Sequence, residues 1–132
     1  MVRYLLDTNI CIHVLKHRPA TARDAFNRHA AYLCTSSVVI AELLYGAEKS
    51  ERPDDNRDAV EAFGARLEVL PFDDRAAAHY GVIRTQLERA GTPIGPYNLM
   101  IAAHARSLGL TLVTNNTRAF QRVPGLLLED WL

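Results

Sequence analysis

Arg3-Tyr4-Leu5-Leu6-Asp7-Thr8-Asn9 is the stretch of sequence that decides the fold. It is a short apolar run of strand type that ends on a carboxylate, and a helical pattern follows directly, with apolar residues at positions 10, 14 and 15. In an open α/β sheet, ligands bind at the rim where parallel strands end and helices begin. We therefore expect Asp7 on such a rim, where other oxygen-bearing side chains would be its partners.

Strands and helices alternate along the rest of the chain. The predicted strands are residues 32–35, 68–70, 111–114 and, at an edge of the sheet, 126–128. The predicted helices are residues 8–17, 21–31, 38–50, 56–67, 74–90 and 97–108. The expected caps are Thr8 or Asn9 for the first helix, Ser36 or Ser37 for the third, and Asp73 or Asp74 for the fifth. In the fifth helix we expect Ala77, Tyr80, Ile83 and Leu87 to be buried, and a polar break precedes the fourth. Such alternation predicts a parallel sheet with right-handed crossovers.

The composition indicates one ordinary globular domain over residues 1–132. Fifteen basic residues balance fifteen acidic ones, so the net charge supplies no long-range attraction to nucleic acid or membrane, and any RNA contact must be local. Cys11 and Cys34 lie in apolar segments without metal-ligand spacing, which predicts buried, reduced thiols. No apolar run approaches about 18 residues and no leader pattern is evident, so we expect a cytoplasmic protein without a membrane span.

Glu42 is out of place in its surroundings. It lies in the apolar run 38–44, on a helix that we expect to be buried on most sides, and it is not at the position of a capping box. A carboxylate buried there costs several kcal/mol unless it is paired or bound to a metal. Two interpretations remain open, a pairing with a buried arginine and a position facing Asp7.

Asparagines supply further oxygens at the junctions of strands and helices. Asn98 falls in the first turn of an apolar helix, and Asn115 and Asn116 follow a predicted strand, where asparagines that only form a turn are the alternative. The five histidines form no zinc-binding pattern, and no phosphate-binding loop or nucleophile elbow is present. Carboxylate and amide oxygens are the ligands that Mg²⁺ or Mn²⁺ prefers, and such an ion can activate a water for attack on phosphorus.

Four segments together resemble the PIN-domain ribonucleases, and among them the VapC-type toxins of toxin–antitoxin pairs. They are Leu6-Asp7-Thr8-Asn9, Ala41-Glu42-Leu43-Leu44-Tyr45-Gly46, Ile94-Gly95-Pro96-Tyr97-Asn98-Leu99-Met100 and Val113-Thr114-Asn115-Asn116-Thr117. The resemblance implies a three-layer α/β fold with a mostly parallel sheet of four to five strands flanked by helices. It also implies Mg²⁺- or Mn²⁺-dependent cleavage of RNA, often structured RNA such as tRNA, a homodimer, and an antitoxin whose C-terminal segment covers the site.

The resemblance also assigns roles to residues. Asp7 and Glu42 match the first two metal-binding acids of the family, and Asn116 matches its fourth polar position, which holds Asp or Asn. Thr8, Thr114 and Asn115 would be supporting polar groups.

Asn98 departs from the family pattern, because it stands where the family has its third acid. An asparagine keeps the shape and one oxygen but removes a full charge, so we expect weaker metal binding and a lower rate. Two origins fit the sequence, a deliberate inactivating substitution and natural divergence.

Three functions follow, in order of preference. The first is a metal-dependent endoribonuclease with Asp7, Glu42, Asn98 and Asn116 as its catalytic residues. The second is a catalytically impaired binding module that docks an antitoxin and contributes to operon repression. The third, a phosphatase-like enzyme with Asp7 as nucleophile, is disfavoured because Asn9 stands where such enzymes carry a second Asp.

Overall fold

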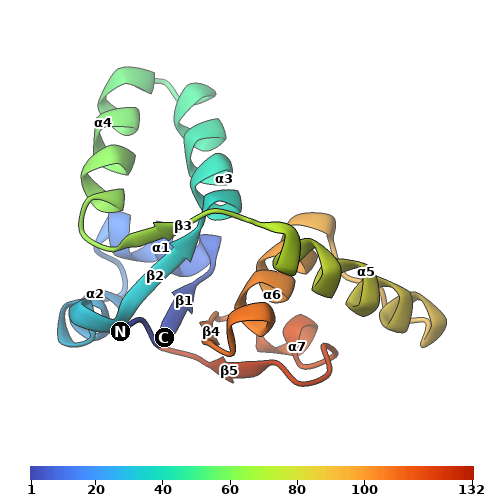
Figure 1. Cartoon of the computed structure of the whole chain (residues 1–132). Helices are drawn as coiled ribbons and strands as arrows, with labels where there is room; N and C mark the ends of the chain where they lie inside the picture. Colours follow the sequence, from blue (N-terminus) through green and yellow to red (C-terminus); the bar gives the residue numbers. More distant parts are fainter.

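The computed structural model describes residues 1–132 and contains a five-stranded parallel sheet in the order β3-β2-β1-β4-β5 (Figure 1). The strands are β1 (Tyr4–Leu6), β2 (Leu33–Ser36), β3 (Glu68–Leu70), β4 (Thr111–Val113) and β5 (Leu127–Glu129). The helices are α1 (Thr8–Lys16), α2 (Ala20–Arg28), α3 (Ser37–Glu48), α4 (Pro53–Gly64), α5 (Asp74–Arg89), α6 (Pro96–Leu108) and α7 (Thr117–Phe120), with a short 3₁₀ turn, η1 (Ala30–Tyr32). The predicted α/β fold with a parallel sheet is confirmed, and β5 is the predicted edge strand.

The strand that begins the chain lies in the middle of the sheet. Leu5 of β1 is paired with Cys34 of β2 on one side and with Leu112 of β4 on the other, and all three side chains are fully buried. A strand covered on both faces must be apolar throughout, which explains the uninterrupted run before Asp7.

The helices form two layers. Right-handed crossovers from β1 to β2 to β3 place α1 to α4 on one face, and the return to β4 and β5 places α5 to α7 on the other. The packing agrees, since α1 contacts α2, α3 and α4, while α5 packs along α6. The direction of the chain across the sheet therefore reverses between β1 and β4, which is where open α/β sheets bind ligands.

Several local predictions are wrong in detail. The cap of α1 is Asp7 itself, whose side chain accepts a hydrogen bond from the Ile10 N–H, and neither Thr8 nor Asn9. The helix α4 ends at Gly64 and does not reach residue 67. Ala76, and not Ala77, lies on the buried face of α5, because the spacing to Ile83 and Leu87 fits a helix only with that register.

The helix α3 is more exposed than its composition suggests. Its buried residues, Val38, Val39, Leu43 and Ala47, occupy one side, and the side that carries Tyr45 faces solvent. The capping residue is Ser36, one of the two predicted, whose Oγ accepts a hydrogen bond from the Val38 N–H.

Both cysteines are buried and free, as predicted. No helix in residues 1–132 combines the length and the apolar character that a membrane span requires.

Candidate active site

Asp7 lies at the carboxyl end of β1, between two strands. Its backbone N–H donates to the Val113 carbonyl of β4, and its carboxylate accepts from the Ile10 N–H at 2.9 Å. The side chain is only 3% exposed. The residue thus continues the strand pairing and caps α1 at once, which fixes the direction of its carboxylate.

Glu42 reaches the same rim from α3. Its Oε1 accepts a hydrogen bond from the Thr8 hydroxyl at 2.6 Å, so Glu42 contacts the residue that follows Asp7. No lysine or arginine forms a salt bridge with Glu42, and the alternative of a buried arginine partner is therefore wrong. Glu42 is half-buried rather than enclosed, because α3 leaves one side open.

The end of β4 supplies the neighbouring polar groups. Thr114 is fully buried, and its hydroxyl accepts from the Asn116 N–H at 2.9 Å and interacts with the Asp7 carboxylate. Asn116 is half-buried, whereas Asn115 is exposed. The structure therefore brings Thr114 and the backbone of Asn116 to Asp7, and it leaves Asn115 facing solvent.

Asn98 occupies the first turn of α6, as predicted, and is half-buried. Its side chain makes no hydrogen bond within the protein, and its neighbour Tyr97 lines the same cavity as Glu42. No three side chains among the histidines, cysteines, aspartates and glutamates converge on a common point.

Burial raises the pKa of Asp7 above its ordinary value. Hydrogen bonds from Thr114 and Ile10 oppose this rise, and the nearby charge of Glu42 adds to it. Two acids near one another, one of them buried and neither paired with a basic side chain, form a site where a cation would relieve the repulsion. The donors are hard oxygens, so the residues present fit Mg²⁺ or Mn²⁺.

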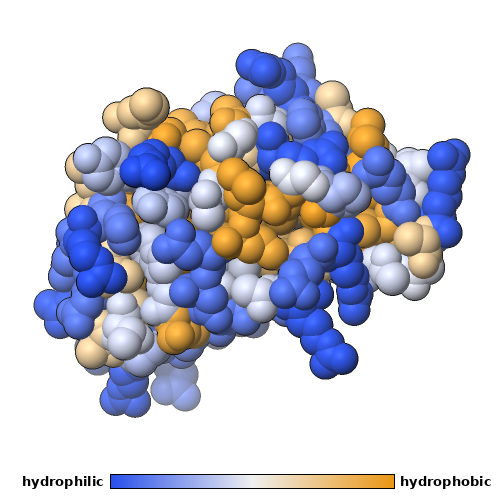
Figure 2. Space-filling view, turned by 90° about the horizontal axis from the view of Figure 1, so that it is seen from below, coloured by the Kyte–Doolittle hydropathy of each residue, from blue (hydrophilic) through white to orange (hydrophobic).

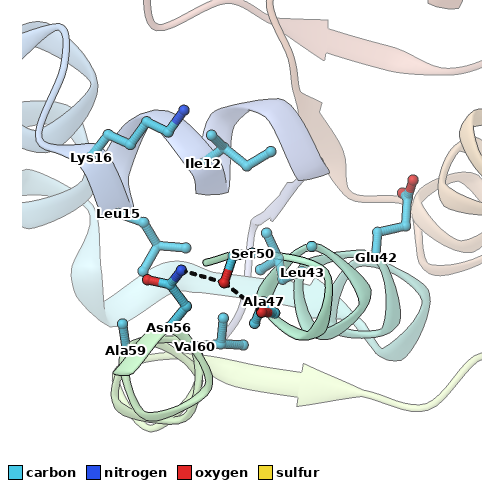
Figure 3. A pocket seen from close by; sticks show the side chains of 11 residues that line it. Ile12, Leu15, Lys16, Glu42, Leu43, Ala47, Ser50, Asn56, Ala59 and Val60 are labelled. Carbon is cyan, nitrogen blue, oxygen red and sulfur yellow. Dashed lines mark hydrogen bonds between the residues drawn. The ribbon is translucent and has the colours of Figure 1, made fainter. Parts of the chain in front are cut away.

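Two connected hollows open beside these residues. The first has a volume of about 690 Å³ and is lined by Thr8, Asn9, Ile12, Ala41, Glu42, Tyr45, Gly46, Lys49 and Tyr97. The second, of about 450 Å³, is an apolar groove between α1, α3 and α4 (Figure 3). Ile12, Glu42 and Gly46 line both hollows, and in Figure 3 Lys16 and Glu42 lie at opposite ends of the groove.

Several side chains at this site were not among the functional residues predicted from the sequence. Tyr45, Lys49 and Tyr97 line the larger hollow, and Ile12 lines both. One signal was available, since Tyr45 lies one helical turn beyond Glu42 and must share its side of α3.

Comparisons with known proteins agree with this fold. The sequence model of a protein family, the PIN domain, matches residues 4–126 of the chain. The tRNA(fMet)-specific endonuclease VapC of Shigella flexneri is 53% identical over 131 residues, which is 99% of each chain. Ribonuclease VapC2 of Haemophilus influenzae is 48% identical over the full length of both chains. The crystal structure of DNA-bound VapBC from Salmonella typhimurium matches with a TM-score of 0.96 and 52% identity, and covers both chains completely.

The fold and these similarities therefore define a PIN-domain protein. The chain belongs to the PIN-domain family, within its branch of VapC-type ribonuclease toxins.

Proposed function

We propose that this chain is the endoribonuclease toxin of a toxin–antitoxin pair, and that it hydrolyses phosphodiester bonds in tRNA with the help of Mg²⁺ or Mn²⁺. The observation that carries the proposal is the convergence of Asp7 and Glu42, joined through Thr8, without a basic partner. The relative from Shigella flexneri is named for cleavage of initiator tRNA(fMet), and we propose the same class of substrate here.

In this proposal Asp7 and Glu42 hold the cation, and Asn98 stands at the third ligand position. When bound, such an ion lowers the pKa of a water and neutralises charge on phosphoryl oxygens. Asp7 is held in place by the Ile10 N–H and the Thr114 hydroxyl, and Thr8 fixes the carboxylate of Glu42 through its short hydrogen bond. Asn116 follows Thr114 at the same rim. The products should carry 5′-phosphate and 3′-hydroxyl ends, because a water attacks phosphorus and the bond to the 3′-oxygen breaks.

Asn98 weakens this site, because it offers one neutral oxygen where a carboxylate would add charge. Asn98→Asp should raise Mn²⁺-dependent cleavage of tRNA by more than about 100-fold, since even residues that only orient metal ligands are worth 10–100-fold. The measurement is the rate of tRNA cleavage in Mg²⁺ and in Mn²⁺, with the ends of the products identified.

Asn115→Asp is the matched control, because it adds the same charge at the exposed side of the rim and should leave the rate unchanged. Equal inertness of Asn98→Asp and the original chain, with both folded, would contradict the role of position 98. Products with cyclic phosphates would contradict hydrolysis by water.

A second candidate function is a binding module that docks an antitoxin without cleaving RNA and contributes to operon repression. The neutral Asn98 favours this candidate. The neighbour from Salmonella typhimurium is a VapBC complex bound to DNA. A metal titration combined with the cleavage assay separates the candidates, since a module that only binds would show neither metal-induced stabilisation nor products.

We propose an antitoxin as the protein partner, with its C-terminal segment in the apolar groove of Figure 3. Ile12, Leu15, Leu43, Ala47 and Val60 give this groove the apolar lining that an amphipathic helix requires. The groove leads to Glu42, so a segment lying along it would cover the site.

We also propose that the protein is a homodimer. Figure 2 shows a contiguous apolar patch on the side of the molecule where β5 and α7 lie in Figure 1. Contiguous apolar surface of this kind marks protein interfaces. Light scattering in solution tests the proposal, and the mass of a monomer at micromolar concentration would contradict it.

A further inference from the structure

Two tyrosines at the mouth of the larger hollow have no role in the fold. Tyr45 is 65% exposed and Tyr97 is 57% exposed, and both line the hollow that contains Thr8 and Glu42. Neither hydroxyl makes a hydrogen bond within the protein. A single exposed ring is ordinary, but two exposed rings that line one hollow together offer flat apolar faces to a ligand.

The two rings come from different sides of the candidate active site. Tyr45 lies on α3, one turn beyond Glu42, and Tyr97 lies at the start of α6, directly before Asn98. A polymer that fills this hollow to reach Glu42 therefore lies beside both tyrosines.

A lysine accompanies one of these rings. Lys49 Nζ lies 4.8 Å from the centroid of the Tyr45 ring and also lines the hollow. Lys49 takes part in no salt bridge, so its charge is available to an anion. In a chain with no net charge, Lys49 is the one lysine or arginine that lines the larger hollow, which contains Glu42.

We propose that Tyr45 and Tyr97 stack against unpaired bases on either side of the bond to be cut, and that Lys49 binds a phosphate next to the base on Tyr45. The proposal rests on the ribonuclease function proposed above and adds that the substrate must be single-stranded at the cleavage point. In a duplex the faces of the bases are already stacked, whereas the bases of a loop can turn out onto aromatic side chains. A loop of a folded RNA is therefore the substrate that this mouth fits.

The test measures RNA binding without cleavage, in EDTA. The probes are three fluorescein-labelled RNAs of similar composition: a short single strand, a hairpin that presents the same bases in its loop, and a fully paired duplex. Tyr45→Ala and Tyr97→Ala should each weaken binding of the single strand and the hairpin by about 5- to 150-fold, the range for loss of one base-stacking ring. The original chain should bind the duplex more weakly than the other two RNAs, and neither substitution should change its affinity for the duplex.

Matched variants separate stacking from other effects. Tyr45→Phe and Tyr97→Phe keep the ring and should bind as tightly as the original chain. Tyr32→Ala removes another exposed tyrosine, 43% exposed and outside the hollow, and should also have no effect. Lys49→Ala should reduce the slope of log Kd against log salt by about 0.7, the value for one phosphate contact on a single strand.

Three results would overturn the proposal. The first is unchanged binding of the single strand by both alanine variants, and the second is an equal loss for the single strand and the duplex. The third is a loss confined to binding of the antitoxin, which would assign the tyrosines to that partner. Because binding is measured without metal, absence of cleavage by Asn98→Asp with these binding effects intact would instead contradict the ribonuclease function and leave the stacking role standing.

Discussion

Asp7 lies in the candidate active site, and its buried charge lowers the stability of the fold. The carboxylate is 3% exposed, and burial, the largest influence on it, raises its pKa above the ordinary value of 3.8. A group whose pKa is higher in the folded state contributes its full stability below its unfolded pKa and loses it as the pH rises through the folded value. At neutral pH the ionised Asp7 therefore weakens the fold, and a bound cation would offset this loss.

Asp7→Asn should consequently stabilise the protein at neutral pH while abolishing its proposed activity. Asparagine caps helices as well as aspartate does, so α1 keeps its cap and only the buried charge is lost. The midpoint of thermal unfolding in EDTA should rise, by about 4 °C for each kcal/mol recovered in a domain of this size. Addition of Mn²⁺ should raise the midpoint of the original chain but not that of the variant.

Asp73→Asn is the control for this comparison. Asp73 caps α5 in the same way, by accepting from the Ala76 N–H, but it is exposed and distant in sequence from the acids of the site. Its substitution should lower the midpoint slightly or leave it unchanged, and should preserve the response to Mn²⁺. A fall in the midpoint for Asp7→Asn as well would show that its charge does not strain the fold.

At the scale of elements, a buried hydrogen bond joins the two helices that carry Glu42 and Asn98. Ser36 Oγ caps α3, and it lies 2.9 Å from Nδ1 of His104 on α6. The His104 side chain is 2% exposed and packs edge-on against Phe72, with ring centroids 5.6 Å apart. This contact sets the position of α6 relative to the start of α3, and therefore the distance between the residues that line the site.

Burial lowers the pKa of His104 below its ordinary value of 6.5, although Asp73 opposes the shift. The unfolded chain therefore takes up a proton more readily than the folded protein, and His104 should make stability fall as the pH drops below about 6.5. His104→Asn, which can still bond to Ser36 but does not titrate, should lose this part of the pH dependence. His104→Leu should lose it too, and should also lower the free energy of unfolding at pH 8 by about 1–3 kcal/mol, because the buried Ser36 hydroxyl loses one of its two hydrogen-bond partners.

Thermal unfolding of the three proteins between pH 5 and pH 8 checks this prediction. If the unfolding midpoint depends on pH in the same way for the original chain and for His104→Asn, His104 is excluded as a source of the pH dependence. Equal stability of His104→Leu and His104→Asn at pH 8 would show that the bond to Ser36 contributes nothing.

At the scale of the whole molecule, the apolar groove and the larger hollow form one surface on α1 and α3. Gly46 lines both hollows, and a Cβ added there would have no other atom within 4 Å. Gly46→Leu should therefore fill the groove without disturbing the fold, and it should gain helix stability of about 0.8 kcal/mol. Binding of the co-expressed antitoxin should fall by more than about tenfold, because a buried helix–groove contact of several side chains is lost.

Gly81→Leu is the matched control. Gly81 lies on α5, on the opposite layer, and also has open space around its Cβ. This variant should gain similar helix stability and keep its affinity for the antitoxin, as measured by calorimetry or by copurification of the pair. Unchanged affinity of Gly46→Leu would place the antitoxin on another surface.

Much of the fold was predictable because its signals are local. The apolar run before Asp7, the alternation of strands with helices and the caps Ser36 and Asp73 depend on neighbours within a few residues, and they gave the right elements. The end of α4 depends on packing between layers, which periodicity alone does not register. The cap of α1 and the buried face of α5 are local features, and there the prediction chose the wrong one of two neighbouring residues.

The candidate site divides in the same way. The amino-acid sequence by itself determined which residues carry oxygens at strand ends, and that Glu42 does not belong in an apolar helix. Only the tertiary structure decided that Glu42 contacts Thr8 and no arginine, that α3 is open on the side of Tyr45, and that Tyr97 lines the same hollow. The reason is physical: a side chain's type and its position along a helix are set by the local chain, but the partner that it meets is set by how the helices pack across the sheet.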